Sequence, residues 1–113
     1  MDRMNSEAAP VLEVSWKDRS WQPTETPGLS YSVLRPHDGG ASIFLKFEKG
    51  VVGANHVHPE GEELLVISGD VTVGGKRLGP GDYLYTPPGA AHEARAHEET
   101  VLFLNFPKSP VFV

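Results

Sequence analysis

The sequence predicts an all-β protein, folded as a barrel or a sandwich of short strands. Short runs rich in β-branched and aromatic residues recur along the chain, and clusters of Gly and Pro separate them. Several runs also alternate with the period of a strand: in 41–47, Ile43, Leu45 and Phe47 share one face. Many short strands with frequent turns are typical of sandwiches and barrels.

The chain has the length of one compact domain. It holds 113 residues, of which 39% are hydrophobic and 22% charged, as in ordinary globular proteins. Residues 1–10 are small and polar and show neither the helix nor the strand period. We therefore expect 1–10 to form a flexible N-terminal arm and 11–113 to form a single domain.

The predicted strands follow one another with turns between them. In chain order they are 12–16, 29–35, 41–47, 62–68, 71–73, 82–86 and 100–106. Gly74-Gly75 predicts a tight hairpin between Gly69 and Gly81. The segment 90–99 is rich in helix-forming residues, but it follows Pro-Pro-Gly and has almost no large apolar residue for a helix to bury. We therefore expect a strand, a loop and a strand there.

Composition excludes several classes of function and of binding site. The net charge is −5 and no Lys/Arg-rich run occurs, so we expect no nucleic-acid partner. No apolar stretch has the length of a signal peptide core or of a membrane span of roughly 18 to 20 residues, so we expect a cytoplasmic protein that does not bind membranes. Without cysteine, only His and carboxylate groups remain as strong ligands for a transition metal.

Three histidines and one glutamate form a candidate metal site. His56 and His58 would lie on the same face of a strand, about 7 Å apart along it. Glu62 begins the next apolar run after a bend at 59–61, and an antiparallel return would bring its carboxylate to the same point. His92 follows a Pro-Pro-Gly turn that can place a later strand beside the first. Such a mixed nitrogen and oxygen set suits zinc, iron, manganese, nickel or copper.

The spacing of these residues resembles the two motifs of the cupin superfamily. The first motif is matched at every fixed position, from Gly50 through the two histidines and Glu62 to Gly69. The second is matched from Gly81 through His92 and differs only at its last position, where Ala96 replaces Asn. The resemblance covers about residues 14–106 and implies a double-stranded β-helix, the jelly-roll β-barrel, that binds one divalent metal through His56, His58, Glu62 and His92.

A closer resemblance is to the cupin domain of ChrR-type anti-sigma factors and its stand-alone relatives. It rests on Trp-Gln-Pro at 21–23, Thr-Pro-Gly-Leu at 26–29, His-Pro-Glu-Gly-Glu-Glu-Leu-Leu-Val at 58–66 and Thr-Pro-Pro-Gly-Ala-Ala-His at 86–92. The resemblance implies zinc on the four residues named above, and some stand-alone relatives are iron dioxygenases. Zinc and iron are thus the favoured metals. The helical sigma-binding domain is absent from this sequence, so sigma-factor control is not implied.

Three functions are compatible with these observations, and the sequence does not decide whether the protein is an enzyme. The first is a metal-dependent dioxygenase acting on a small oxygenated substrate, with Tyr85 as a candidate proton donor. The second is a non-catalytic, zinc-binding, ChrR-like sensor or binding module. The third is the processing of a sugar acid or sugar phosphate, which needs a basic anchor. Candidate anchors are Arg35, Lys46, Lys76, Arg77 and Arg95.

The remaining predictions concern the pocket, the surface and the assembly. Alternation suggests that Leu64, Val66, Tyr85 and Phe103 line the pocket. We expect Glu60, Glu63, His37 and His97 to be solvent-exposed or structural. A small molecule is the expected partner. A homodimer is also expected, with the apolar run 110–113 able to add a strand to the edge of a second copy.

Overall fold

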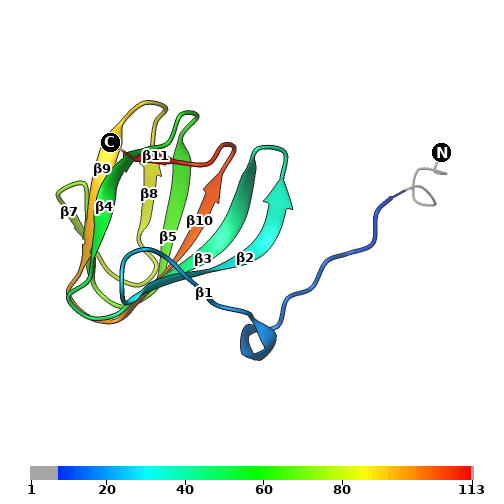
Figure 1. Ribbon diagram of the computed structural model, residues 1–113, viewed down its shortest axis with the longest axis horizontal. Coiled ribbons are helices and arrows are strands. Elements are labelled where there is room, and N and C mark those ends of the chain that lie inside the picture. Colours follow the sequence, from blue (N-terminus) through cyan, green and yellow to red (C-terminus); the bar gives the residue numbers. More distant parts are fainter. Residues whose placement is uncertain (1–7, 113) are drawn as a thin grey trace.

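The computed structural model describes residues 8–112 as two antiparallel sheets that face each other in a jelly-roll barrel (Figure 1). The six-stranded sheet has the order β1 (Gln22–Pro23), β2 (Leu29–His37), β3 (Gly40–Phe47), β10 (Thr100–Phe106), β5 (Glu62–Ser68), β8 (Tyr83–Thr86). The five-stranded sheet has the order β11 (Val111–Phe112), β4 (Val52–Val57), β9 (Ala91–Ala96), β6 (Val71–Val73), β7 (Lys76–Leu78). This architecture confirms the all-β prediction.

Most of the predicted strands are present at nearly their predicted bounds. β5, β6 and β10 have the expected limits, and β2, β3 and β8 differ by one or two residues at an end. Gly74-Gly75 joins β6 to β7, so the predicted hairpin is confirmed. The segment 90–99 is not helical, and most of it forms β9. Small residues at its inward positions, Ala94 and Ala96, let β9 pack closely over the core.

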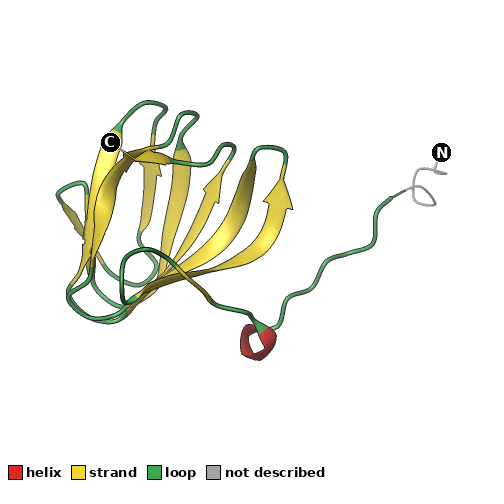
Figure 2. Cartoon of the chain, viewed as in Figure 1, coloured by secondary structure: helices red, strands yellow, loops and turns green. Residues whose placement is uncertain are grey.

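The predicted strand at 12–16 is wrong. Residues 8–15 have no regular structure, and a short 3-10 turn, η2 (Trp16–Asp18), follows (Figure 2). Leu12 is 59% exposed because this segment runs away from the barrel and has no neighbouring strand to pair with. Of the predicted arm 1–10, positions 1–7 lie outside the described residues.

The C-terminal run, which the sequence suggested could add a strand to a second copy, forms a strand in its own sheet. Val111 and Phe112 form β11, which pairs with Val57 and His56 of β4 in the same chain. This pairing uses the free edge of β4 and draws Ser109 and Pro110 across the end of the barrel that holds His56. The strand expected at a partner's edge therefore closes an edge of its own sheet.

The core lies between the two sheets. Alternate residues of β5 and β10 point inward, and Leu64, Val66, Leu102, Leu104 and Phe106 are each at most 7% exposed. Across the barrel they meet the buried residues of β6 and β9. Within residues 8–112, the structure has no helix with the length and apolar character that a membrane crossing requires.

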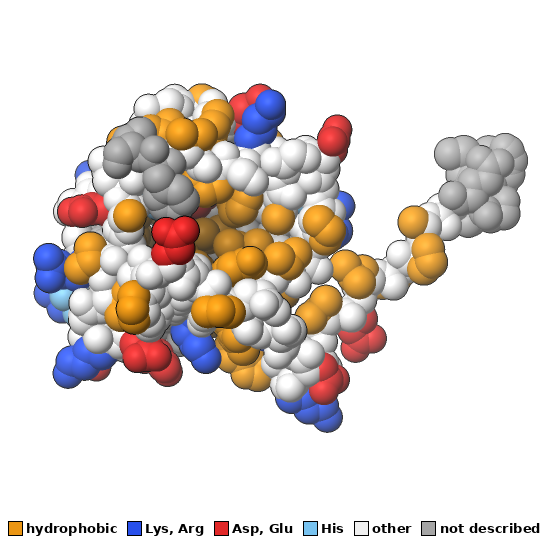
Figure 3. Space-filling view, viewed as in Figure 1, with side chains coloured by type: hydrophobic (Ala, Val, Ile, Leu, Met, Phe, Trp, Pro, Cys, Tyr) orange, Lys and Arg blue, Asp and Glu red, His pale blue; other side chains and the backbone are white. Residues whose placement is uncertain are grey.

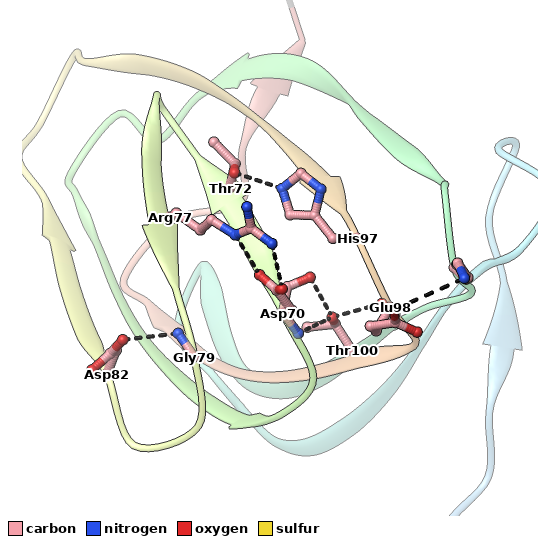
Figure 4. Close-up of polar contacts among 9 residues, drawn as sticks. Asp70, Thr72, Arg77, Gly79, Asp82, His97, Glu98 and Thr100 are labelled. Carbon is pink, nitrogen blue, oxygen red and sulfur yellow. Dashed lines mark hydrogen bonds and ion pairs between the residues drawn. The ribbon is translucent and has the colours of Figure 1, made fainter.

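A network of polar groups, here called the Asp70 network, closes one end of the barrel (Figure 4). It consists of Asp70, Arg77, Glu98 and Thr100. The Asp70 carboxylate accepts hydrogen bonds from the Arg77 guanidinium at 3.0 and 2.7 Å. The Asp70 backbone N–H donates to Thr100 Oγ1 at 3.1 Å, and this fully buried hydroxyl lies 2.9 Å from the Glu98 carbonyl oxygen. The network ties the end of β5 to the start of β10.

Candidate metal centre

Two of the predicted ligands lie side by side in the five-stranded sheet. His56 on β4 is directly opposite His92 on β9 in the antiparallel register. This is the arrangement expected of a later strand folding beside the first. His58 follows the last residue of β4 and is 1% exposed, with its ring 5.4 Å from the ring of Phe106. The strand therefore presents His56, and the turn after it turns His58 inward.

Glu62 reaches the same point from the other sheet. It is the first residue of β5, which belongs to the six-stranded sheet and pairs with β8 and β10 rather than with β4. The expectation that its strand lies next to the histidine strand is therefore wrong, although its side chain is 2% exposed and points inward. Gly61, with φ of +89°, makes the sharp bend that carries the chain between the sheets.

The four side chains converge closely enough to share one ion. One potential ligand atom from each of His56, His58, Glu62 and His92 lies within 4.8 Å of the other three. His56 Nε2 is 3.1 Å from Nε2 of both other histidines. Glu62 Oε2 is 2.6 Å from His58 Nε2. Two nitrogens bound to one metal at about 2.0 to 2.1 Å are themselves about 2.9 to 3.4 Å apart, so this spacing fits a shared ion.

The hydrogen bonds around the rings favour metal-binding tautomers. His56 Nδ1 donates to the Ala54 carbonyl at 2.8 Å, which leaves a lone pair on Nε2 when the ring is neutral. His92 Nδ1 lies 3.2 Å from the Thr86 hydroxyl. Nitrogens that face one another at 3.1 Å need a proton or a cation between them. The imidazoles are thus oriented by outer partners in the manner typical of metal sites.

Burial makes the cluster costly unless something occupies its centre. Glu62 Oε1 is fully buried and makes no hydrogen bond with the described residues, and the same holds for His58 Nδ1. Burial lowers the pKa of His92, and the nearby Glu62 carboxylate opposes this shift. A buried carboxylate oxygen without a hydrogen bond is destabilising, and a cation at the point of convergence would satisfy it. The residues therefore fit a divalent metal.

The cluster lies on the wall of a large apolar cavity. The cavity has a volume of about 790 Å³ and opens between the two sheets. Figure 3 shows hydrophobic side chains around a hollow in this face of the molecule. Apart from the four ligand candidates, most of its lining is aliphatic or aromatic and comes from β2, β3, β5 and β10. The arrangement can therefore hold a small molecule beside the candidate ion.

The predicted pocket residues divide between the two faces of the sheet. Leu64 lines the cavity, and Val66 is buried beneath it in the core. Tyr85 and Phe103 do not line the cavity, because their strands alternate with the opposite phase and place them on the outer face. Tyr85 is 53% exposed, and the neighbouring Thr86 is the inward residue. The Tyr85 hydroxyl lies close to Gly61, the residue before Glu62, but Tyr85 is not among the residues that line the cavity.

Tyr31 is a cavity residue that the sequence analysis missed. It lies on β2 opposite Leu45, on the inner face of the six-stranded sheet, and lines the cavity. The alternation of residues 29–35 could have indicated its face once Leu29 and Val33 were assigned to the interior.

Three residues that the sequence analysis assigned to solvent-exposed or structural roles, Glu63, His37 and His97, lie away from the cluster. Glu63 is exposed on the outer face, where its carboxylate accepts a hydrogen bond from the Tyr83 hydroxyl at 2.9 Å. His37 and His97 are only partly exposed. His37 Nε2 lies 3.1 Å from Asn105 Oδ1, and His97 Nε2 lies 2.8 Å from Thr72 Oγ1 (Figure 4). These side chains have structural partners and stay outside the candidate site.

Comparison with protein families identifies the domain type. Residues 11–109 match the family described as the ChrR Cupin-like domain. The DNA damage-repair/toleration protein DRT102 of Arabidopsis thaliana is 33% identical over 97 residues, which cover 80% of this chain and 31% of that protein. The chain thus spans about a third of the length of this relative.

Solved structures share the fold over most of the chain. An acetylacetone dioxygenase from Acinetobacter johnsonii has a TM-score of 0.80 at 17% identity, covering 94% of this chain and 78% of that one. KdgF from Halomonas sp. has a TM-score of 0.72 at 29% identity, covering 84% and 94%. The anti-sigma factor ChrR in complex with SigE from Rhodobacter sphaeroides has a TM-score of 0.71 at 17% identity, covering 91% and 72%.

Proposed function

This chain belongs to the family of ChrR cupin-like domains, and we propose that it is a metal-dependent dioxygenase acting on a small oxygenated molecule. The observation that carries the proposal is the position of His56, His58, Glu62 and His92 on the wall of the 790 Å³ cavity. A metal that only stabilised the fold would need no space beside it, and closed structural sites keep no open position. A cavity of this size can take a drug-sized ligand.

The chain's own residues would bind, orient and exclude water. His56, His58, Glu62 and His92 would hold the ion, with the Ala54 carbonyl and Thr86 hydroxyl fixing two of the rings. An iron ion bound there would supply Lewis acidity and the means to activate dioxygen. The apolar lining would keep bulk water from the reacting atoms. The proposed reaction breaks one carbon–carbon bond beside a carbonyl group and places one oxygen atom of dioxygen on each carbon of that bond, so it needs no external reductant.

A zinc-binding sensor or binding module is the second candidate. Four protein ligands are the number that a closed tetrahedral zinc site uses. The family is also named after ChrR, which is an anti-sigma factor. Zinc is redox-silent, so this candidate predicts ligand binding without turnover. Processing of a sugar acid has less support, because no Lys or Arg lines the cavity among the described residues.

Oxygen uptake separates the two leading candidates. The protein would be loaded with iron or with zinc, and dioxygen consumption would be followed with a panel of small dicarbonyl and phenolic ketone compounds. The dioxygenase proposal predicts uptake with the iron form, none with the zinc form, and its loss in Glu62→Gln. Binding of the panel compounds by both forms without uptake by either would contradict it and would favour the sensor.

We further propose that the protein is a homodimer. Apolar side chains remain exposed on the outer face of β5 and β8, among them Leu65, Ile67, Tyr83 and Tyr85 at 36 to 55% exposure. A contiguous apolar surface is often an interface. Light scattering coupled to gel filtration should give about twice the chain mass of 12.3 kDa, and a Leu65→Lys/Ile67→Lys double variant should run as a monomer. The cytoplasmic location stays a prediction.

A further inference from the structure

The wall of the cavity next to the candidate metal is apolar and open. Val33, Ile43 and Leu104 lie in register on β2, β3 and β10, and Leu64 continues the row on β5, two residues from Glu62. Val33 is 45% exposed although it faces the inside of the barrel. These residues line the same cavity as the four ligand candidates and leave aliphatic surface uncovered in it. A ligand with an apolar body would cover it.

Away from the candidate ion, the charges of the lining disfavour anions. Among the described residues, no Lys or Arg lines the cavity, and the one charged side chain there besides the four ligand candidates is Glu25. Glu25 is exposed, on the loop that connects β1 to β2. An anionic substituent lying on the apolar wall would lose its hydration without gaining a counterion, and Glu25 would repel it. An uncharged substituent meets neither cost.

We propose that the cavity selects an uncharged oxygenated molecule whose apolar body lies against Val33, Ile43 and Leu104. This inference rests on the proposed function in one respect: the oxygen atoms of the bound molecule are taken to contact the metal ion. Leu64 lies two residues from Glu62, about 7 Å along β5. From Leu64 the row crosses the sheet through Leu104 and Ile43 to Val33, at about 4.8 Å per strand, so the apolar body extends away from the ion across three strands. Val33 is the natural position at which to change the selectivity, because its partial exposure leaves room for a longer side chain.

The test compares two probes that differ by one charge. Zinc-loaded protein would be titrated calorimetrically with 1-phenylbutane-1,3-dione and with 1-(4-carboxyphenyl)butane-1,3-dione. Zinc is used because it is redox-silent, so the protein cannot oxidise the probes during the titration. We expect the uncharged probe to bind at least about tenfold more tightly. Because both probes are compared on the wild-type protein, this result does not depend on the folding of any variant. Equal or tighter binding of the carboxylated probe, or no binding of either probe to the zinc-loaded protein, would overturn the proposal.

Matched lysine variants locate the selectivity on this wall. Val33→Lys places a cation in the cavity, whereas Val52→Lys makes the same change at a valine that is 38% exposed and lies outside it. We expect Val33→Lys to raise the affinity for the carboxylated probe about tenfold and Val52→Lys to leave it unchanged. Equal shifts in both variants would contradict the inference.

A second variant and a prior measurement complete the design. Glu25→Lys changes an exposed residue at the cavity, so it should fold even if Val33→Lys does not, and it should shift the preference in the same direction. An unchanged preference in Glu25→Lys would count against the charge argument. Zinc content is determined before any probe is added. If the protein binds iron but not zinc, the titrations are made with the iron form without dioxygen, and a protein that binds neither metal would refute the proposed function and the metal contact of this inference with it.

Discussion

Polar side chains gather at both ends of strand β5, but the two clusters differ in how their polar atoms are satisfied. At one end, Glu62 meets three imidazoles, and Glu62 Oε1 and His58 Nδ1 are buried without a hydrogen bond from the described residues. At the other end, the Asp70 carboxylate receives both of its hydrogen bonds from Arg77, and the buried Thr100 hydroxyl has backbone partners.

The difference distinguishes a binding site, formed by His56, His58, Glu62 and His92, from a structural cluster, the Asp70 network. The end of the barrel that holds the Asp70 network is here called the clamp end. Polar groups cost little when they are paired, as the Asp70 carboxylate is with Arg77 near the surface and the buried Thr100 hydroxyl is with backbone groups. Folding buries unpaired ones only where a ligand completes the set, as the four converging side chains require. Substitutions at the Asp70 end should therefore alter stability alone, and those at the other end should alter metal binding first.

The largest effect is expected from Gly69→Ala, at the clamp end. Gly69 has φ of +103°, and a Cβ there would lie 2.4 Å from the Glu99 carbonyl oxygen and 2.4 Å from Thr100 Oγ1. Relief of these contacts requires movement of backbone, so we expect the free energy of unfolding to fall by about 3 kcal/mol or more, measured by urea denaturation.

Gly75→Ala is the matched control for this substitution. Gly75 has a similar φ of +81°, but a Cβ added there would have no other atom within 4 Å. Only the conformational cost of about 1 to 2 kcal/mol should appear. Equal losses in the two variants would show that the close approach to Thr100 does not set the requirement for glycine at position 69.

Two threonine substitutions should separate the ends directly. Thr86 and Thr100 are both buried, and Val replaces the hydroxyl of each with a methyl group of similar size. Thr86→Val removes the partner of His92 Nδ1 and should weaken metal affinity about 10- to 100-fold. Thr100→Val should leave metal affinity unchanged and lower the free energy of unfolding by about 1 to 3 kcal/mol.

Metal titration and urea denaturation of both variants give the result. A Thr100→Val variant that lost metal affinity as strongly as Thr86→Val would mean that the two ends are coupled through β5 and β9. The division into binding site and structural cluster would then be wrong. Loss of stability in Thr86→Val without any change in metal affinity would contradict it equally.

The smallest effect concerns the acid stability of the clamp end. The hydrogen bond from Arg77 is the main cause that holds the pKa of Asp70 below its usual value of 3.8. A lowered folded-state pKa contributes stability above the unfolded value, and this contribution disappears as the pH falls through the folded-state pKa. At neutral pH the melting temperature of the wild type should therefore be slightly higher than that of Asp70→Asn. This difference in melting temperature should disappear as the pH falls below about 3.8.

Salt gives the control for this pair. The Arg77 side chain is largely exposed and that of Asp70 partly exposed, so 1 M salt should reduce the neutral-pH difference in melting temperature. A difference that persisted unchanged at pH 2 would mean that the Asp70→Asn substitution disturbs the backbone contacts with Thr100 rather than the ion pair.

Strands with a clear alternation or a continuous apolar run could be predicted from the sequence, and so could the convergence of distant residues through a known spacing. The alternating run 43–47 belongs to β3, and the continuous apolar runs 64–67 and 101–104 belong to β5 and β10. The histidines and Glu62 were found because four ligand-type residues occur at cupin spacing, a pattern that a single His could not supply.

The remaining features depend on tertiary context. Residues 12–16 alternate like a strand but have no neighbour to pair with, whereas 91–96 lacks large apolar residues and becomes a strand because β4 and β6 flank it. Tyr85 and Phe103 were assigned to the wrong face because alternation gives the period and not its phase. The sheet that carries Glu62 depends on the whole topology, which local patterns do not contain.

The most direct test of the account is elemental analysis of untagged protein from iron-supplemented and zinc-supplemented cultures, with His56→Ala, His92→Ala and His97→Ala beside the wild type. His97 lies at the clamp end, bonded to Thr72, and serves as the control. The account predicts about one bound metal ion per chain in wild type and His97→Ala, and its loss in the other two variants. Absence of metal from the wild type, or its full retention in His56→Ala and His92→Ala, would contradict the assignment.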